Sequence, residues 1–188
     1  VILNLVKTDG RFTAGTSTVM LVTKTTGKKA TYDIVVKQSQ KLDVLTITPP
    51  DLIAAGDKNV EFAYSAVDQF GNAITSGLTS FAITAPSGYS LAFVNDPVTG
   101  NDKLIFNDNR TSPTAGPVIF TALTDTNKFV QVQINLKDKA VPTVVAGIKD
   151  FNKVYATGAT ADFSTAANVI VNDQYGREMA IPDGYTVK

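Results

Sequence analysis

An alternating segment that ends in a polar turn decides the fold, and it spans residues 60–72 with the sequence VEFAYSAVDQFGN. Up to Ala66, apolar side chains occupy every second position on one face, whereas Glu61 and Ser65 lie on the other. A period of two is typical of a β-strand that is buried on one side. In the turn that follows, an aspartate can accept backbone N–H groups and a glycine can adopt positive φ. The segment therefore predicts a half-buried strand followed by a tight turn.

Two elements of the sequence repeat. The segment Val67-Asp68-Gln69-Phe70-Gly71-Asn72 returns 105 positions later as Asn172-Asp173-Gln174-Tyr175-Gly176-Arg177. A pair of strands within residues 14–37, which follows Ala-Gly and ends in lysine, returns about 100 positions later within residues 115–137. The repeating unit therefore has about 100 residues, a length typical of a sandwich of about seven strands.

The order of these elements sets the expected domain boundaries. Only residues 41–137 contain the Asp-Gln-aromatic-Gly element and the closing strand pair in that order, so we expect one complete unit there. Residues 1–40 are expected to be the C-terminal strands of a preceding unit, and residues 138–188 the N-terminal strands of a following unit. Both ends then cut through structured sequence. The short junctions at residues 39–41 and 137–139 favour units held end to end over loosely tethered domains.

The complete unit is expected to contain seven strands, because turns rich in glycine, proline, asparagine and aspartate divide it regularly. The strands are expected at Asp43–Thr48, Val60–Val67, Ser80–Ala85, Tyr89–Val94, Lys103–Asn107, Val118–Leu123 and Phe129–Lys137. Five aromatic side chains are predicted to fill the core: Tyr64, Phe81, Phe93, Phe106 and Phe120. The predicted fold class is all-β, with immunoglobulin-like β-sandwich domains in tandem.

Composition argues against most catalytic and nucleic-acid-binding classes. The 17 Lys and Arg residues balance the 17 Asp and Glu residues, so no net positive charge favours nucleic acid. The absence of His and Cys removes the commonest general base, the usual zinc ligand and the thiol nucleophile. A carboxylate pair of the glycosidase type stays formally open, although the aspartates lie in turn-like contexts. We predict that the segment is not an enzyme, and that it has no nucleic-acid partner and no membrane span of about 18 apolar residues.

Charge is distributed unevenly along the chain. Residues 1–40 carry six positive and two negative groups, whereas residues 41–137 carry six positive and nine negative groups. Two interpretations stay open: solvated strand faces and turns, or attraction between successive units that salt would weaken.

The motif at residues 67–72 and the closing strand pair up to Lys137 resemble the bacterial Ig-like domains of invasin/intimin-type adhesins and of surface-layer proteins. With many Thr, Val and Lys residues, no Cys and two Met, the composition is most similar to the tandem Ig-like region of a Bacillus-type surface-layer (S-layer) protein. Two positions depart from the family pattern. Arg177 follows the glycine where asparagine is usual, and Phe81 stands where many such domains carry tryptophan.

The resemblance implies a structural protein that is secreted and located at the bacterial cell surface or cell wall. Its units would act as rigid spacers and lattice contacts, with copies of itself as partners in a self-assembled layer and a cell-wall polymer bound through regions outside this chain. Two alternatives stay open: the stalk of an invasin/intimin-type adhesin, and a spacer domain of a secreted polysaccharide-degrading enzyme. The partial end units are either trimmed or swapped between neighbouring molecules.

Two copies of the turn motif supply the candidate site residues, which are Asp68, Gln69, Phe70, Gly71, Asp173, Gln174, Tyr175 and Gly176. We expect a structural turn at the end of the sandwich, with the aromatic ring covering the end of the core. The alternative is a turn that docks on a neighbouring unit or subunit, with Asp68 as a contact.

Calcium is the candidate cofactor, because Asp and Asn oxygens suit this cation and because the resemblance implies calcium in lattice formation. The candidate ligands are Asp96, Asp102 and Asp108, with Asp51 and Asp138 as further candidates. Their spacing is not that of an EF-hand loop, so a polar hairpin region is the competing interpretation.

Overall fold

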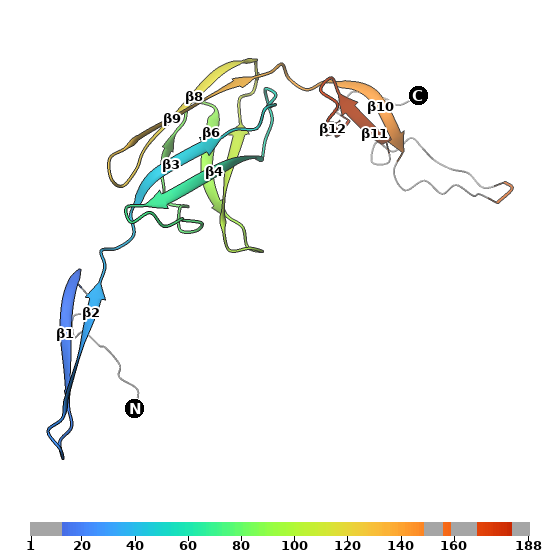
Figure 1. Cartoon of the computed structure of the whole chain (residues 1–188). Helices are drawn as coiled ribbons and strands as arrows, with labels where there is room; N and C mark the ends of the chain where they lie inside the picture. Colours follow the sequence, from blue (N-terminus) through green and yellow to red (C-terminus); the bar gives the residue numbers. More distant parts are fainter. Residues whose placement is uncertain (1–12, 149–155, 159–168, 182–188) are drawn as a thin grey trace.

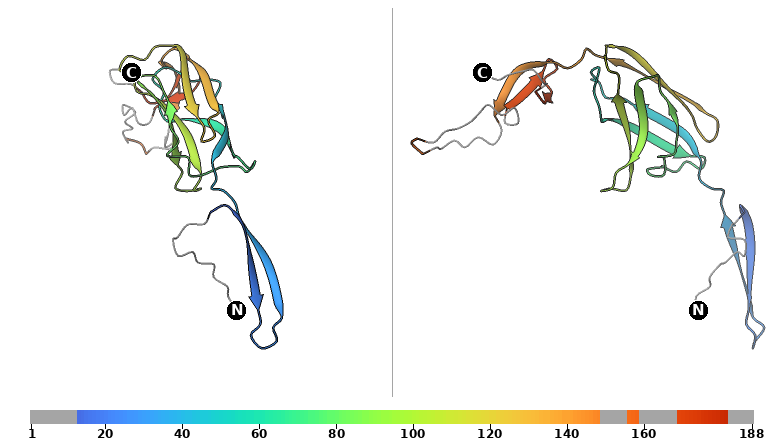
Figure 2. Two further views of the ribbon diagram at one scale, coloured as in Figure 1. Left: turned by 90° about the vertical axis from the view of Figure 1, so that its left-hand side faces the viewer. Right: turned by 180° about the vertical axis from the view of Figure 1, so that it is seen from behind.

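Three bodies follow one another in the computed structural model, which describes residues 13–148, 156–158 and 169–181. A hairpin comes first, the central body of strands β3 to β9 follows, and a small sheet comes last. The hairpin and the small sheet lie at opposite ends of the central body (Figures 1 and 2). Within the described ranges, no helix has the length and apolar character that crossing a membrane requires. The predictions for the remaining residues lie outside the described part.

The central body is a sandwich of two antiparallel sheets. The first sheet has the order β3-β4-β7-β6, and the second has the order β5-β8-β9. Their bounds are Leu42–Thr48 for β3, Val60–Asp68 for β4, Ile83–Thr84 for β5, Tyr89–Asn95 for β6, Asp102–Asp108 for β7, Gly116–Leu123 for β8 and Phe129–Leu136 for β9. If the seven strands β3 to β9 are renumbered from 1 to 7 in chain order, one sheet has the order 1-2-5-4 and the other 3-6-7. This is the strand order of a constant-type immunoglobulin sandwich. The prediction of an all-β fold is confirmed.

Six of the seven expected strands begin and end within two residues of their expected positions. The exception is the strand expected at Ser80–Ala85, which forms only at Ile83–Thr84. Its first half is a turn instead, because the Phe81 N–H donates to the Leu78 carbonyl oxygen at 2.8 Å. This short strand pairs with β8 at one edge of the second sheet.

The core is built on aromatic rings that meet between the two sheets. Phe106 from β7 packs edge-on against Phe120 from β8, with ring centroids 5.9 Å apart, and stacks on Phe62 at 5.6 Å. All three are fully buried. Phe93 is also buried as expected, whereas the rings expected in the core at positions 64 and 81 are only partly buried. The expected core list omitted Phe62, although the alternation of β4 places it on the apolar face.

The two repeated hairpins share their antiparallel strand pairing, although the turn of the first is one residue longer than that of the second. Strands β1 (Gly15–Val22) and β2 (Lys29–Val36) pair as β8 and β9 do, from Gly15↔Val36 in one and Gly116↔Leu136 in the other. Gly27 and Asn127 occupy the left-handed position of their turns, with φ of 65° and 64°. The third body pairs β11 (Val169–Asp173) with β10 (Pro142–Ile148) and β12 (Glu178–Met179), so it opens with a strand pair like β3 and β4.

Replacing Phe106 by alanine is expected to lower the free energy of unfolding of the central body by about 3–5 kcal/mol, because a cavity is left between the sheets. Urea unfolding followed by circular dichroism measures this. Val98→Ala is the matched control, since Val98 is 90% exposed and its truncation should change stability by no more than about 0.5 kcal/mol. Equal effects of the two substitutions would contradict the assignment of the core.

Candidate functional site

Asp68 ends β4 and closes the turn that follows it. Its Oδ1 accepts the backbone N–H groups of Phe70 (2.9 Å) and Asn72 (2.8 Å), and the Asn72 side-chain amide donates to its Oδ2 at 3.0 Å. The Asp68 N–H donates to the Asn72 carbonyl oxygen at 2.9 Å. Gly71 has a φ of 85°, which an L side chain would strain. These bonds fix a tight turn at the pole of the sandwich.

The Asp68 carboxylate is buried and yet stays ionised near neutral pH. Burial raises its pKa, but the hydrogen bonds from Asn72 and from the Phe70 N–H outweigh this effect. The pKa of Asp68 therefore lies below its ordinary value of 3.8. The same balance holds the pKa of Asp173 below 3.8, with Arg177 and the Tyr175 N–H as the donors.

Gln69 holds the chain segment that enters the central body. Its Nε2 donates to the Ser39 carbonyl oxygen at 2.8 Å, and its Oε1 accepts the Lys41 N–H at 2.7 Å. A carboxamide carries one acceptor and one donor side by side, so it pairs with an extended chain as a peptide group does. Gln40 adds a bond from its side-chain amide to Asp68 Oδ2 at 3.3 Å. We call the two bonds from a motif glutamine to the entering chain the junction clamp.

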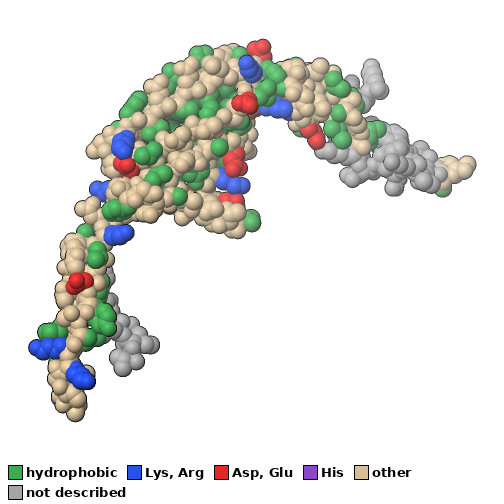
Figure 3. All heavy atoms as spheres, viewed as in Figure 1, with side chains coloured by type: hydrophobic (Ala, Val, Ile, Leu, Met, Phe, Trp, Pro, Cys, Tyr) green, Lys and Arg blue, Asp and Glu red, His purple; other side chains and the backbone are tan. Residues whose placement is uncertain are grey.

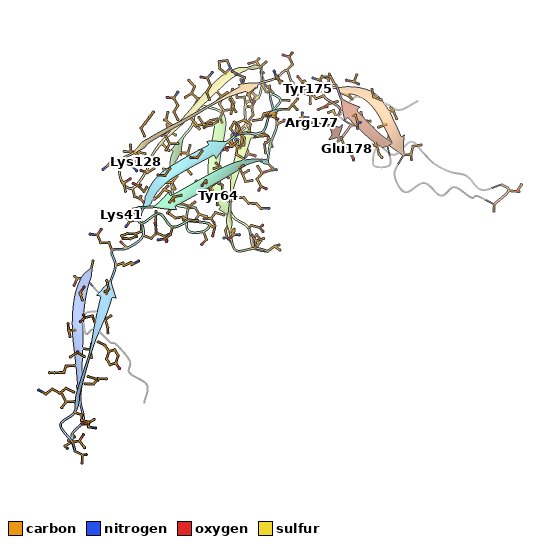
Figure 4. All side chains as sticks on the ribbon, in the orientation of Figure 1. Lys41, Tyr64, Lys128, Tyr175, Arg177 and Glu178 are labelled. Carbon is orange, nitrogen blue, oxygen red and sulfur yellow. The ribbon has the colours of Figure 1, made fainter. Side chains whose placement is uncertain are left out.

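The second copy of the motif makes a second junction clamp. Gln174 Nε2 donates to the Lys139 carbonyl oxygen at 3.0 Å, and its Oε1 accepts the Val141 N–H at 2.8 Å. Asp173 Oδ1 accepts the N–H groups of Tyr175 and Arg177, both at 2.9 Å. Both motifs therefore bond to the same two positions of their entering segments, 100 residues apart in the chain. Figure 4 labels Lys41 at the start of β3 and Tyr175 beside the second junction.

The motif aromatic points toward the junction and not over the core, so that expectation was wrong. Phe70 is 45% exposed, and the Lys37 ammonium lies 5.9 Å from its ring centroid. The Tyr175 hydroxyl donates to the Asp138 carbonyl oxygen at 3.0 Å, within the junction itself. The core cluster is closed here by Ile74, which follows the turn and donates from its N–H to the Ala66 carbonyl oxygen.

Arg177 makes the same bonds within its turn as Asn72 does, and it also bonds to the central body. Its backbone N–H and its Nε donate to Oδ1 and Oδ2 of Asp173, both at 2.9 Å, as the backbone and side chain of Asn72 do to Asp68. Its Nη1 and Nη2 then reach Asp57 on the central body, at 2.6 Å to Oδ2 and 3.3 Å to Oδ1. Acidic and basic side chains meet at this junction in the space-filling view (Figure 3).

The pole of the central body beside this contact is held by a second arginine. Arg110 donates from Nε and Nη2 to the two oxygens of Asp108, at 2.9 and 2.7 Å, and stacks 4.5 Å over the Tyr89 ring. Asp108 Oδ2 also accepts the Gly56 N–H at 2.9 Å. Burial raises the pKa of Asp108, but the bonds from Arg110 and Gly56 outweigh it and hold the pKa below 3.8.

The three candidate calcium ligands have separate partners. Asp96 accepts the Val98 N–H at 3.0 Å and pairs with Lys103 at 3.2 Å. Asp102 is buried and accepts the Leu78 N–H at 2.6 Å, and Asp108 is paired as described above. The described part of the chain contains no group of three or more His, Cys, Asp or Glu residues placed to hold a metal ion. Calcium binding stays a prediction.

A hollow beside β4 has a volume of about 310 Å³. Its acidic lining residue is Asp102, whose carboxylate is already bonded to Leu78, and its rim includes Tyr64 and Ile74. The Tyr64 hydroxyl donates to the Asp102 carbonyl oxygen at 2.7 Å. This lining offers one buried carboxylate and not the facing pair that glycoside hydrolysis needs.

Comparisons with known proteins bear on the fold. No protein-family model matches the chain, and no curated protein matches it. Domains 1–6 of the surface layer protein SbsC match with a TM-score of 0.51 and 17% identity, over 93% of this chain and 22% of that one. SbsC domains 6–7 and 4–9 give TM-scores of 0.36 and 0.37 and identities of 21% and 20%, over 72% and 88% of this chain and 63% and 27% of theirs. The chain thus has the fold of surface-layer protein domains and spans about a fifth of the first of these structures.

Removing one junction clamp by Gln69→Ala is expected to speed amide exchange at Lys41 by about thirtyfold, because the two lost bonds contribute about 1 kcal/mol each. Hydrogen–deuterium exchange of the segment around Lys41 measures this. Gln133→Ala on the exposed face of β9 is the control and should leave Lys41 unchanged. Unaltered protection of Lys41 in Gln69→Ala would mean that the clamp does not hold the segment.

Acid is expected to destabilise the central body through Asp68 and Asp108. Their folded pKa values lie below 3.8, so the unfolded chain binds protons more readily as the pH falls. Stability should be constant above about pH 5 and decline progressively below it. Thermal melts between neutral pH and about pH 2 measure this. Asp108→Asn should flatten the decline, whereas Val98→Ala, which removes no carboxylate, should not. A flat wild-type profile would contradict the assignment.

Proposed function

We propose that this chain is a structural segment of a bacterial surface-layer protein, in which Ig-like units act as rigid spacers and lattice contacts. The observation that carries the proposal is the junction clamp, made twice with the same geometry by Gln69 and Gln174. A protein that only displays separate domains has no need to anchor its linkers. One that must keep fixed distances between units does.

Little of either linker is left without a bond to a neighbouring unit. Strand β2 ends at Val36, and the first clamp begins at Ser39. At the second junction, Lys137 donates to the Ile53 carbonyl oxygen at 2.8 Å and accepts the Ala55 N–H at 2.9 Å. Short and bonded linkers restrict bending, which supports a spacer role.

The chemistry of the central body also supports a non-catalytic role. The buried carboxylates Asp68, Asp102 and Asp108 are each consumed by hydrogen bonds within the fold. In the described residues, no buried side-chain nitrogen or oxygen atom is left without a partner. Catalytic groups are usually available to a substrate, whereas these groups are engaged in holding turns and poles.

The shared fold with the SbsC domains supports the same proposal, and it extends to location and partners. We place the protein at the bacterial cell surface after secretion, with copies of itself as lattice partners. A cell-wall polymer would be bound through regions outside this chain, and calcium is the ion we expect to stabilise the assembly.

Electron microscopy of the complete natural protein tests the proposal. We expect ordered two-dimensional sheets, and we expect a variant with residues 41–137 replaced by a flexible Gly-Ser segment to lose the lattice order or change its spacing. Soluble monomers that bind host cells would indicate an adhesin stalk, and polysaccharide hydrolysis by the same polypeptide would indicate a spacer in an enzyme. Either result overturns the surface-layer proposal.

Calcium is tested separately on this chain. Addition of millimolar calcium to a chelator-treated sample is expected to raise the melting temperature, since binding to the folded state alone stabilises it. Magnesium at the same concentration is the control for ionic strength. An unchanged melting temperature would show that this segment does not bind calcium at that concentration.

A further inference from the structure

The two junctions differ at one position of otherwise matching motifs. The residue after the motif glycine is Asn72 at the first junction and Arg177 at the second. Both residues satisfy the aspartate of their own turn through backbone and side-chain nitrogen atoms. The difference is therefore not needed for the turn itself, and it requires another physical account.

The Asn72 side-chain amide makes its hydrogen bonds within its own turn. Its Nδ2 lies 3.0 Å from Oδ2 and 3.3 Å from Oδ1 of Asp68, so both oxygens of that carboxylate face the same amide. An asparagine side chain is also too short to reach past the turn. Besides the junction clamp, the contacts described at this junction are the bond from the Gln40 side-chain amide to Asp68 Oδ2 at 3.3 Å, the bond from the Gln69 N–H to the Lys41 carbonyl oxygen at 3.3 Å, and the Lys37 ammonium 5.9 Å from the Phe70 ring centroid. All three involve the linker that follows β2, and none involves β1 or β2 themselves.

The Arg177 side chain is long enough to do both tasks. Its Nε bonds to Asp173, while its Nη1 and Nη2 bond to Asp57, so one guanidinium lies between two carboxylates of different bodies. The fork of an arginine suits this arrangement because its five N–H donors lie in one plane. The pairing is partly shielded from water, with 35% of the Arg177 side chain and 17% of the Asp57 side chain exposed.

Bonds within the central body hold Asp57 in place independently of Arg177. Its Oδ2 accepts the Ala54 N–H at 2.8 Å, and its own carbonyl oxygen accepts the Asp108 N–H at 2.9 Å. Asp108 is fixed in turn by Arg110. The carboxylate is therefore preorganised on a rigid pole, and little conformational entropy remains to be lost when the guanidinium binds.

We propose that the residue after the motif glycine determines how each unit docks on the unit before it. Arginine latches the turn onto a unit that carries an acidic residue at the position of Asp57. Asparagine makes no bond to the preceding unit, so that junction is held by the contacts of the linker, chiefly the junction clamp. The junction at residues 137–141 is then stiffer than the junction at residues 37–41. This inference concerns the joining of units and does not depend on the surface-layer role.

Spin-label distances across the two junctions test the latch, because the chain has no cysteine and pairs can be introduced freely. Labels at Val98 and Val145 span the second junction, and labels at Val98 and Val35 span the first; all three side chains are exposed. We expect a narrower distance distribution across the second junction. Arg177→Asn, which copies Asn72, is expected to broaden that distribution by about twofold and to leave the first pair unchanged.

Asp57→Asn is the second variant, since it lies on the central body and its side-chain oxygen can still accept the Ala54 N–H. It should broaden the second distribution as Arg177→Asn does, even if the latter disturbs the β10–β12 sheet. Circular dichroism melts verify that the central body stays folded. An unchanged distribution in Asp57→Asn, or equal widths across the two wild-type junctions, would overturn the proposal.

Discussion

A side-chain amide that pairs with main chain is the interaction on which the arrangement of the units depends. The sandwich alone fixes the positions of the strands within one unit. It does not fix the direction in which the linker from the preceding unit enters. Gln69 and Gln174 supply that direction by binding a carbonyl oxygen and an N–H two residues apart on the entering segment. The turn aspartates make this possible, because Asp68 and Asp173 hold each glutamine at a fixed place beside the strand end.

Buried aspartates recur at the ends of the strands, and three of them are matched to a nitrogen-rich side chain close in sequence. Asp68 is paired with Asn72, Asp108 with Arg110, and Asp173 with Arg177. Backbone N–H groups supply the remaining bonds. Such carboxylates replace the disulfide and tryptophan that stabilise antibody domains, because they tie loops to the sheets while aromatic rings fill the space between the sheets. The cost of burying charge is offset by several donors at each site.

The alternation of apolar residues was sufficient to predict the sandwich and most strand bounds, because burial of one sheet face dominates there. It failed at residues 80–82, where a local turn bond competes with strand pairing. The outward position of Phe70 and the clamp by Gln69 were not predictable, since both depend on where the linker passes in space. Asp57 was missed for the same reason: its partner Arg177 lies 120 residues away. The departure of Arg177 from the usual asparagine was the one signal in the sequence.

The bridge between residues 53–55 and Lys137 has a mechanical consequence. The two segments run parallel, and each contributes one backbone bond, from Lys137 to Ile53 and from Ala55 to Lys137. Tension applied through the two junctions would pull these segments in opposite directions along their length. Their bonds would then be loaded in shear together and not peeled one after another. Resistance to stretching depends on the rate of unfolding and not on the equilibrium free energy of unfolding. These two bonds therefore slow unfolding under force more than their small contribution to the equilibrium stability would suggest.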